Sequence, residues 1–147
     1  MDRTRSPVSD VLRAATEEIL VSITADLDIV EARQRGRGLA LQLGYSPMDA
    51  TLIATAISEL ARNIVLYAGR GTVALRAVSQ DGRRGIRIVA CDEGPGIADP
   101  ALAASGGYST SGGLGLGLSG VRRLMDEFHV ASMRDRGTTV TVTRWKR

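Results

Sequence analysis

The longest periodic apolar stretch in the chain follows the dipeptide Ser46-Pro47. Serine is a preferred helix cap and proline suits the first helical turn, so this dipeptide predicts a helix start. Gly69 is the expected end of that helix. Four apolar side chains between these points recur at helical spacing: Ile53, Ile57, Leu60 and Ile64. The pattern therefore predicts one long helix with a single core-facing side.

The rest of the hydrophobic pattern predicts strands and two further helices. Ile19–Ile23 is rich in β-branched residues and predicts a strand. Asp26 or Asp28 can cap a helix that ends at Gly44. The other expected elements are strands at residues 72–78 and 85–91, a helix at 116–127, and strands at 129–133 and 138–145. Asp81-Gly82 lies between the first two of these strands and is typical of a tight hairpin.

This order of elements predicts the fold class. Helices that cover one face of a mixed β-sheet form a two-layer α/β (α+β) sandwich. The 147 residues fit one domain. We expect that domain to span residues 18–147, after a flexible tail of residues 1–17.

The composition argues against some classes of function, nucleic-acid binding and membrane spanning among them, but does not identify one. The chain is 44% apolar and 24% charged, with a net charge of +3, as in ordinary soluble globular proteins. It has no basic block of the kind that binds nucleic acid, and no apolar run near the ~18 residues of a membrane span. Cys91 is the single cysteine and excludes an internal disulfide, which favours a reducing, cytoplasmic setting. Cys91 itself is expected to be a buried strand residue.

Glu59 and Asn63 form the first candidate site, on the long predicted helix. Because they are four residues apart, they lie one turn above each other on the same side. By helical angle that side borders the stripe of Ile57, Leu60 and Ile64, so both polar groups are expected at the rim of the core. Taken alone, a Glu/Asn pair at this spacing is most often an ordinary helix surface.

The second candidate site runs from Asp92 to Gly96 (DEGPG) and directly follows an apolar strand. An acidic side chain at a strand end can accept a hydrogen bond from an adenine amino group. The glycines let the backbone turn tightly and approach a flat ring. The competing interpretation is a plain turn, because Asp, Gly and Pro are common turn residues.

The third candidate site is the run of alternating glycines from Gly113 to Gly117, at the start of a predicted helix. Backbone N–H groups and the helix dipole at such a start can hold phosphate with little positive charge. A flexible linker is the alternative, although linkers seldom interleave leucines. Gly115 to Gly120 also fits GxGxxG, with Asp135 at the spacing of a dinucleotide fold. That motif has to follow a strand directly, and here it follows a Ser/Gly-rich segment, so a dinucleotide site is disfavoured.

Taken in order, the three segments resemble the GHKL superfamily of ATPases and kinases, which has the Bergerat fold. Glu59 to Asn63 (ELARN) resembles its N box, Asp92 to Gly96 its G1 box, and Gly113 to Leu118 its G2 box. Residues 98–112 resemble the ATP lid. Gly137-Thr138 resembles the Gly-Thr pair that sits by the adenine pocket.

The resemblance implies a site for ATP and Mg²⁺. Asn63 would ligate Mg²⁺, Glu59 would act as general base toward a serine hydroxyl, and Asp92 would select adenine. The lid segment contains no Lys or Arg, so Arg62 or hydroxyls such as that of Thr110 are the candidates to contact the γ-phosphate. The other implied nucleotide contacts are Gly94, Gly96, Ile97, Ser111, Gly113, Leu114, Gly115, Leu116, Gly117, Leu118 and Thr138.

From about Ile19 onward, segments such as SELARNIVLYAGRG and YSTSGGLGLGLSGVRRLMDEF resemble the switch serine kinases of the bacterial stressosome. This resemblance implies an ATP-dependent serine/threonine-protein kinase that phosphorylates STAS-domain proteins and, once released, activates a PPM-type phosphatase. An anti-sigma factor kinase and a non-catalytic, nucleotide-gated binding module remain alternatives. The catalytic half of a sensor histidine kinase is less favoured, because the chain has no room for a helix pair bearing a phospho-accepting histidine.

Overall fold

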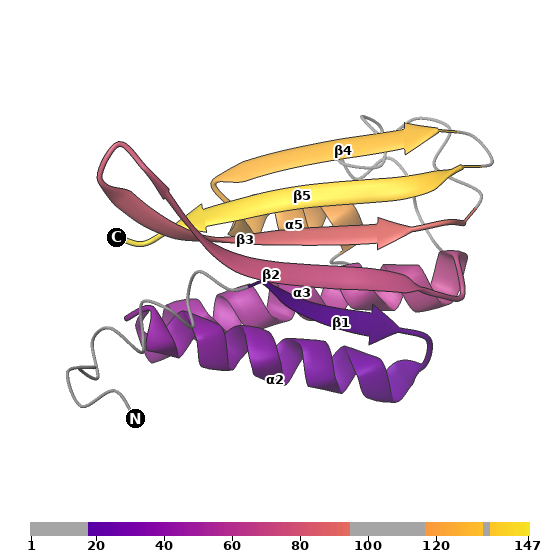
Figure 1. Cartoon of the computed structure of the whole chain (residues 1–147), viewed down its shortest axis with the longest axis horizontal. Coiled ribbons are helices and arrows are strands. Elements are labelled where there is room, and N and C mark those ends of the chain that lie inside the picture. Colours follow the sequence, from indigo (N-terminus) through magenta and orange to yellow (C-terminus); the bar gives the residue numbers. More distant parts are fainter. Residues whose placement is uncertain (1–17, 95–116, 134–135) are drawn as a thin grey trace, which may run out of the picture.

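Five strands form one sheet in the computed structural model, which describes residues 18–94, 117–133 and 136–147. The elements in chain order are β1 (Ile19–Ile23), α2 (Asp26–Gln42), α3 (Pro47–Tyr67), β2 (Gly71–Gln80), β3 (Arg83–Asp92), α5 (Gly117–Leu124), β4 (Glu127–Met133) and β5 (Gly137–Trp145). The described helices all lie on one face of the sheet (Figure 1). The expected two-layer α+β sandwich is confirmed, whereas the expected tail of residues 1–17 lies outside the described residues.

The sheet is antiparallel at each of its described strand pairings, although the sequence favoured a mixed sheet. The strand order is β1-β2-β3-β5-β4. Strands β3 and β4, which α5 connects, run in the same direction. The hairpin after β4 places β5 between them, so this parallel pair is never adjacent.

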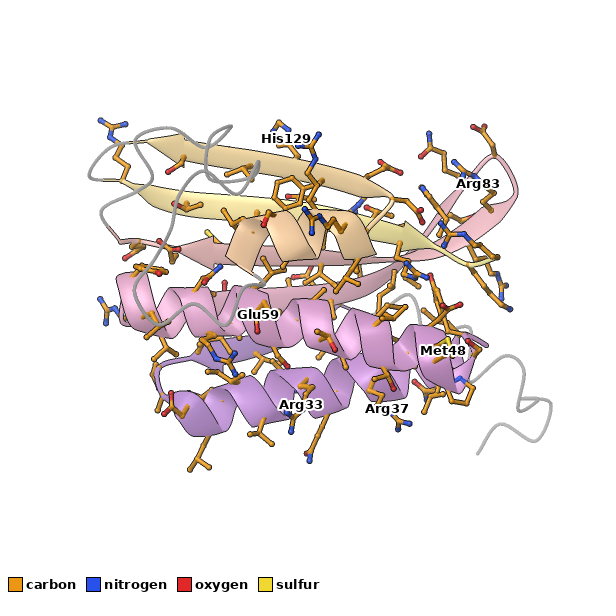
Figure 2. All side chains as sticks on the ribbon, turned by 180° about the vertical axis from the view of Figure 1, so that it is seen from behind. Arg33, Arg37, Met48, Glu59, Arg83 and His129 are labelled. Carbon is orange, nitrogen blue, oxygen red and sulfur yellow. The ribbon has the colours of Figure 1, made fainter. Side chains whose placement is uncertain are left out.

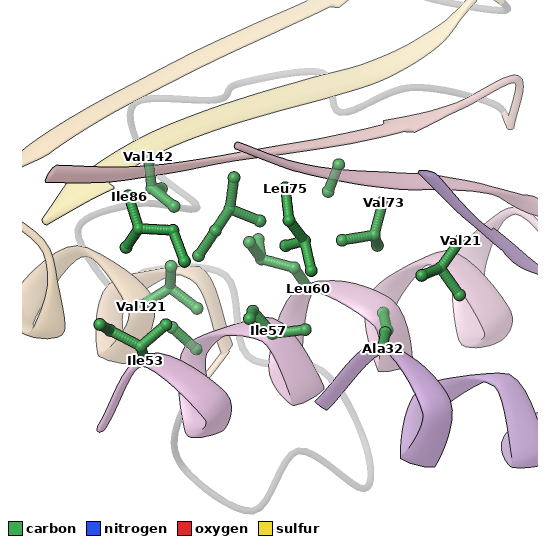
Figure 3. Packing of buried hydrophobic residues seen from close by; sticks show 14 of the residues in the cluster. Val21, Ala32, Ile53, Ile57, Leu60, Val73, Leu75, Ile86, Val121 and Val142 are labelled. Carbon is green, nitrogen blue, oxygen red and sulfur yellow. The ribbon is translucent and has the colours of Figure 1, made fainter. Parts of the chain in front are cut away.

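The core lies between the sheet and α3 (Figure 3). The core residues that the sequence predicted on α3 are at most 2% exposed: Ile53, Ile57, Leu60 and Ile64. They share one cluster with strand side chains that include Val73, Leu75, Ile86 and Val142. Full burial of each such side chain contributes about 1.5–3 kcal/mol to folding. This packing fixes α3, and with it the Glu59–Asn63 turn, against the sheet.

The start of α2 is capped by the second of the two candidate aspartates, Asp28. One of its carboxylate oxygens accepts hydrogen bonds from the N–H groups of Thr24 (2.8 Å) and Ala25 (3.1 Å). The bond from the Thr24 backbone is the main reason that the pKa of Asp28 lies below its usual range. Helix α3 starts as predicted, with Ser46 Oγ accepting a hydrogen bond from the N–H of Asp49 at 3.1 Å.

Helix α5 is shorter than the sequence predicted, because it ends at Leu124 and not near Glu127. The Leu124 carbonyl accepts a hydrogen bond from Arg144 Nη1 at 2.7 Å. Two residues later, the N–H of Asp126 donates to the Thr143 carbonyl at 2.9 Å, so the chain has already joined the sheet. Contacts with β5 end this helix. The hydrophobic periodicity from which the helix was predicted contains no information about those contacts.

Cys91 is exposed, contrary to the expectation of a buried thiol. Side chains alternate between the two faces along a strand. Ile86, Ile88 and Ala90 are buried toward the helices, so Cys91 belongs to the opposite face of β3. There its sulfur accepts a hydrogen bond from Thr139 Oγ1 at 3.4 Å.

Candidate nucleotide site

Glu59 and Arg62 form an ion pair on α3. Arg62 Nη1 donates to Glu59 Oε1 at 2.9 Å. The Glu59 side chain is 11% exposed, whereas that of Arg62 is 39% exposed. The carboxylate therefore lies at the rim of the core, as its helical position predicted, with a more accessible cation beside it. Figure 2 shows Glu59 in the helical layer, on the middle of α3.

Asn63, one turn beyond Glu59, lies near the end of α3 that adjoins the end of β3. Its side chain is partly buried. Past β3, Gly94 approaches Ala68 so closely that a Cβ on Gly94 would lie 2.6 Å from the Ala68 Cβ. Ala68 is the C-cap of α3. The structure thus brings the helix end that carries Asn63 next to the strand end that carries Asp92.

Asp92 is held in one orientation at the end of β3. Its Oδ1 accepts hydrogen bonds from the N–H of Gly94 at 2.9 Å and from the N–H of Thr138 at 3.3 Å. Among the described residues, no donor bonds the second oxygen, Oδ2. A carboxylate fixed through one oxygen can offer the other as an acceptor, which is the chemistry that an exocyclic amino group requires.

Gly137 and Thr138 support Asp92 from the start of β5. Gly137 has a φ of 97°, and a Cβ there would lie 2.0 Å from the Asp92 carbonyl oxygen, so the position requires glycine. Thr138 is 8% exposed, and its hydroxyl lies 2.9 Å from Ser132 Oγ. The Gly-Thr pair that the resemblance singled out therefore contacts Asp92 directly.

Most of the expected nucleotide contacts lie outside the described residues, as does the lid segment 98–112. They are Gly96, Ile97, Thr110, Ser111, Gly113, Leu114, Gly115 and Leu116. From the same glycine run, Gly117 opens α5 with a φ of 41°. Leu118 is 9% exposed and packs in the core, so its side chain anchors the start of α5.

The described residues hold no group of three or more His, Cys, Asp or Glu side chains placed to bind a metal ion. The Mg²⁺ site that the sequence resemblance implies would have a different composition: one Asn63 amide oxygen, with phosphate oxygens and water as the other ligands. Oxygen ligands of this kind suit Mg²⁺. In the part of the chain that the structure describes, no helix is both long and apolar enough to span a bilayer.

Sequence reasoning missed two residues that shape this site, Ser132 and Ala68. Ser132 lies on β4, where its hydroxyl donates to the Gly137 carbonyl at 3.2 Å and bonds with Thr138. Ala68 provides the small surface against which Gly94 packs. Neither role can be read from the sequence. The role of Ser132 depends on the register of β4 against β5, and that of Ala68 depends on contact between segments far apart in the chain.

The chain matches the family of histidine kinase-, DNA gyrase B-, and HSP90-like ATPases over residues 48–147. It is 49% identical over 131 residues to the serine/threonine-protein kinase RsbT of Bacillus subtilis (strain 168), which covers 89% of this chain and 98% of that relative. It is 30% identical over 120 residues to the anti-sigma F factor of Caldanaerobacter subterraneus subsp. tengcongensis, covering 78% of this chain and 82% of that relative.

Two solved structures share the fold. The mycobacterial sensor histidine kinase MprB has a TM-score of 0.53 at 18% identity, over 90% of this chain and 98% of its own. A chain of the SiaB–SiaC complex from Pseudomonas aeruginosa has a TM-score of 0.53 at 14% identity, over 97% of this chain and 99% of its own. The match over residues 48–147 and the 49% identity to RsbT confirm the resemblance to the GHKL superfamily. The chain belongs to the histidine kinase-, DNA gyrase B-, and HSP90-like ATPase family.

Proposed function

We propose that this RsbT-like chain is an ATP-dependent serine/threonine-protein kinase that phosphorylates STAS-domain proteins of the stressosome. The observation that carries the proposal is the placement of Glu59, one turn from Asn63, on the helix whose end adjoins Asp92. Membership of an ATPase family supports ATP as the ligand. The 49% identity to RsbT supports protein kinase chemistry. Once released from its substrates, the kinase activates a PPM-type phosphatase in the cytoplasm.

In the proposed reaction, Oδ2 of Asp92 accepts a hydrogen bond from the adenine amino group, and the Asn63 amide oxygen would hold Mg²⁺. The metal, when bound, neutralises charge on the phosphates. The substrate serine oxygen attacks the γ-phosphorus while Glu59 takes the hydroxyl proton. The bond from the γ-phosphorus to the β–γ bridging oxygen breaks, and ADP leaves.

Arg62 is proposed to neutralise charge on the γ-phosphate. Since residues 97–112 contain no Lys or Arg, the cation has to come from elsewhere in the chain. Arg62 lies one residue before Asn63, and its side chain is 39% exposed, so it can turn toward a bound triphosphate. When the Arg62 side chain moves away from Glu59, the Glu59 carboxylate would also become free to accept the serine proton.

The Glu59→Gln variant tests the proposal, because it keeps the shape of the side chain and removes the base. We expect phosphate transfer from labelled ATP to a STAS-domain protein to fall about 100-fold or more. ATP affinity, measured by calorimetry with Mg²⁺, stays within about twofold of native, since general-base catalysis acts on the transfer step. The matched control is Glu31→Gln on α2, which should transfer phosphate normally. Transfer at the native rate by Glu59→Gln would remove Glu59 as the base.

Anti-sigma factor activity is the second candidate, because one relative at 30% identity is an anti-sigma F factor. Such a protein would bind a sigma factor directly. A pull-down of the purified chain against sigma factors and STAS-domain proteins, with and without ATP, separates the two functions. Retention of STAS-domain proteins alone supports the stressosome kinase, and retention of a sigma factor supports the alternative.

A further inference from the structure

The helix-facing side of the sheet becomes polar at the end where β3 stops and β5 begins (Figure 1). In the last apolar row, Ala90 on β3 lies opposite Val140 on β5. Side chains on one face recur at every second position along a strand. The next row on this face therefore contains Asp92 on β3 and Thr138 on β5, and Thr138 pairs with Ser132 on β4. The candidate adenine contact is one end of a polar row that crosses three strands.

The peptide unit between Gly137 and Thr138 is held at both of its ends. A trans peptide group is planar, and its carbonyl and N–H point in opposite directions. The Gly137 carbonyl accepts a hydrogen bond from Ser132 Oγ at 3.2 Å. The N–H of the same peptide unit, that of Thr138, donates to Asp92 Oδ1 at 3.3 Å. One rigid group thus connects the Ser132 hydroxyl to the Asp92 carboxylate.

This peptide unit needs a restraint because a glycine precedes it. Gly137 has a φ of 97°, and without a Cβ its backbone can rotate where other residues cannot. A reversed peptide would withdraw the N–H from Asp92 and turn the carbonyl oxygen toward the carboxylate, where two acceptors repel each other. The hydrogen bond from Ser132 opposes that rotation, so the orientation of Asp92 depends on it.

The same serine also fixes the hydroxyl of Thr138. Ser132 Oγ lies 2.9 Å from Thr138 Oγ1, and the distance alone does not show which of the two donates. The Gly137 carbonyl can only accept, so Ser132 gives its proton to that bond and Thr138 donates to Ser132. With its proton engaged, the Thr138 hydroxyl offers only lone pairs to other groups. Asp92 and Thr138 therefore both present acceptors at this end of the sheet.

We propose that Ser132 is a positioning residue for base recognition, through which the site selects adenine over a purine that carries a carbonyl oxygen in place of the amino group. The inference rests on the proposed ATP-dependent function. Ser132 acts through the Gly137–Thr138 peptide unit, which holds Asp92 by Oδ1 and keeps Oδ2 as the acceptor. An amino group donates to that oxygen, whereas a carbonyl oxygen is repelled by it.

The test compares the affinities of the full chain for ATP and for inosine triphosphate, measured by calorimetry with Mg²⁺. Inosine triphosphate has a carbonyl oxygen where ATP has the amino group, and we expect the native chain to bind it about tenfold or more weakly. Ser132→Ala should weaken ATP binding about three- to tenfold, the effect of one hydrogen bond. It should also lower the preference for ATP about threefold or more, because the released peptide lets Asp92 turn away from the carbonyl oxygen.

The kinetic constants give a second readout of the same variant. Base contacts are the same before and during phosphate transfer, so their loss raises the KM and leaves kcat unchanged. We expect kcat of Ser132→Ala at saturating ATP to stay within about twofold of native.

Ser132→Thr and Ser132→Val form a matched pair, since they have similar shapes and only the threonine keeps the hydroxyl. Both residues are β-branched and suit a strand. The threonine variant should keep the native preference for ATP, and the valine variant should behave like Ser132→Ala. The control is Ser79→Ala, which removes an exposed hydroxyl on β2 and should bind both nucleotides like the native chain.

Equal weakening of both nucleotides by Ser132→Ala and Ser132→Val would show that Ser132 only supports the fold, and would overturn the proposal. An unchanged preference and affinity in these two variants would overturn it as well. In both cases the native chain still binds ATP, so the proposed function is unaffected. A native chain that does not bind ATP would instead refute the proposed function and this inference with it.

Discussion

The guanidinium of Arg62 donates to the carboxylate of Glu59 across 2.9 Å, in the second half of α3. The pair joins the proposed general base to the nearest cation. Because Arg62 is 39% exposed, solvent screens this attraction, and such pairs contribute at most about 1 kcal/mol to stability. The contact can therefore break at small cost when a triphosphate offers Arg62 a more negative partner.

Replacing Arg62 with Ala should slow phosphate transfer with little effect on folding. We expect kcat to fall about tenfold or more, because a cation at the transferring phosphate stabilises charge in the transition state. The KM for ATP should change less than kcat, and Arg62→Lys should recover part of the rate. Steady-state kinetics with labelled ATP measure both constants. An Arg62→Ala protein with native kcat would show that the Glu59 pair is only a surface contact.

Replacing Asp92 with Asn should weaken ATP binding while leaving the fold intact. The oxygen of the new amide can still accept from the N–H groups of Gly94 and Thr138, as Oδ1 does now. The amide nitrogen then replaces Oδ2 and presents a donor to the adenine amino group. We expect the Kd for ATP, measured by calorimetry, to rise about tenfold or more. Glu93→Gln, at the exposed neighbouring position, is the control and should bind ATP normally.

Replacing Gly36 with Ala should destabilise the protein, although alanine is the better helix former. The new Cβ would lie 2.0 Å from Cδ1 of Ile57, which is fully buried. Overpacking of this kind costs about 1–3 kcal/mol and exceeds the gain of about 1 kcal/mol in helix propensity. Urea unfolding measures the free energy of unfolding. Adding Ile57→Val removes the obstructing methyl group, so the double variant should be more stable than the two separate losses predict.

The phenol of Tyr45 should make the stability of the protein sensitive to alkaline pH. It is 5% exposed and donates to the Arg144 carbonyl at 2.5 Å, and its burial raises the pKa of Tyr45 to about 12. In the unfolded chain the pKa is the ordinary 10.0. Since the folded value is higher, the stabilisation is fully present below pH 10 and is lost as the pH rises from 10 toward 12.

Tyr45→Phe tests this linkage. At pH 7 the variant should lose about 0.5–1.5 kcal/mol, the net contribution of one hydrogen bond. Between pH 10 and pH 12 the native protein loses stability more steeply, so the difference between the two should shrink. Denaturant unfolding across this range provides the measurement. Tyr67→Phe, at a position that is 45% exposed, should follow the native curve. A difference that stays constant with pH would contradict the assignment to Tyr45.

Local patterns in the sequence accounted for the elements that local forces specify. The strand Ile19–Ile23, the start of α3 at Ser46 and the hairpin at Asp81-Gly82 all occur where the pattern predicted them. Each depends on β-branching, capping or turn chemistry within a few residues of chain. The rim position of Glu59 also followed from helical angle alone, because the core stripe of α3 is regular.

Other features needed the tertiary structure. The early end of α5 at Leu124 depends on Arg144, and the exposure of Cys91 depends on which face of the sheet the helices cover. The burial of Trp145 is also a tertiary outcome: it is 4% exposed, and Arg83 lies over its ring at 4.6 Å from the centroid. The contacts of Thr138 with Asp92 and Ser132 likewise join three strands.

The sequence by itself determined which segments form helices and strands, and which types of side chain are available at the candidate site. Both depend on the local spacing and chemistry of the residues. Only the folded chain decided which of those groups meet, where α5 stops, and that Cys91 is exposed. The physical reason is that these outcomes depend on strand register and on packing between segments far apart in the chain, which no local pattern encodes.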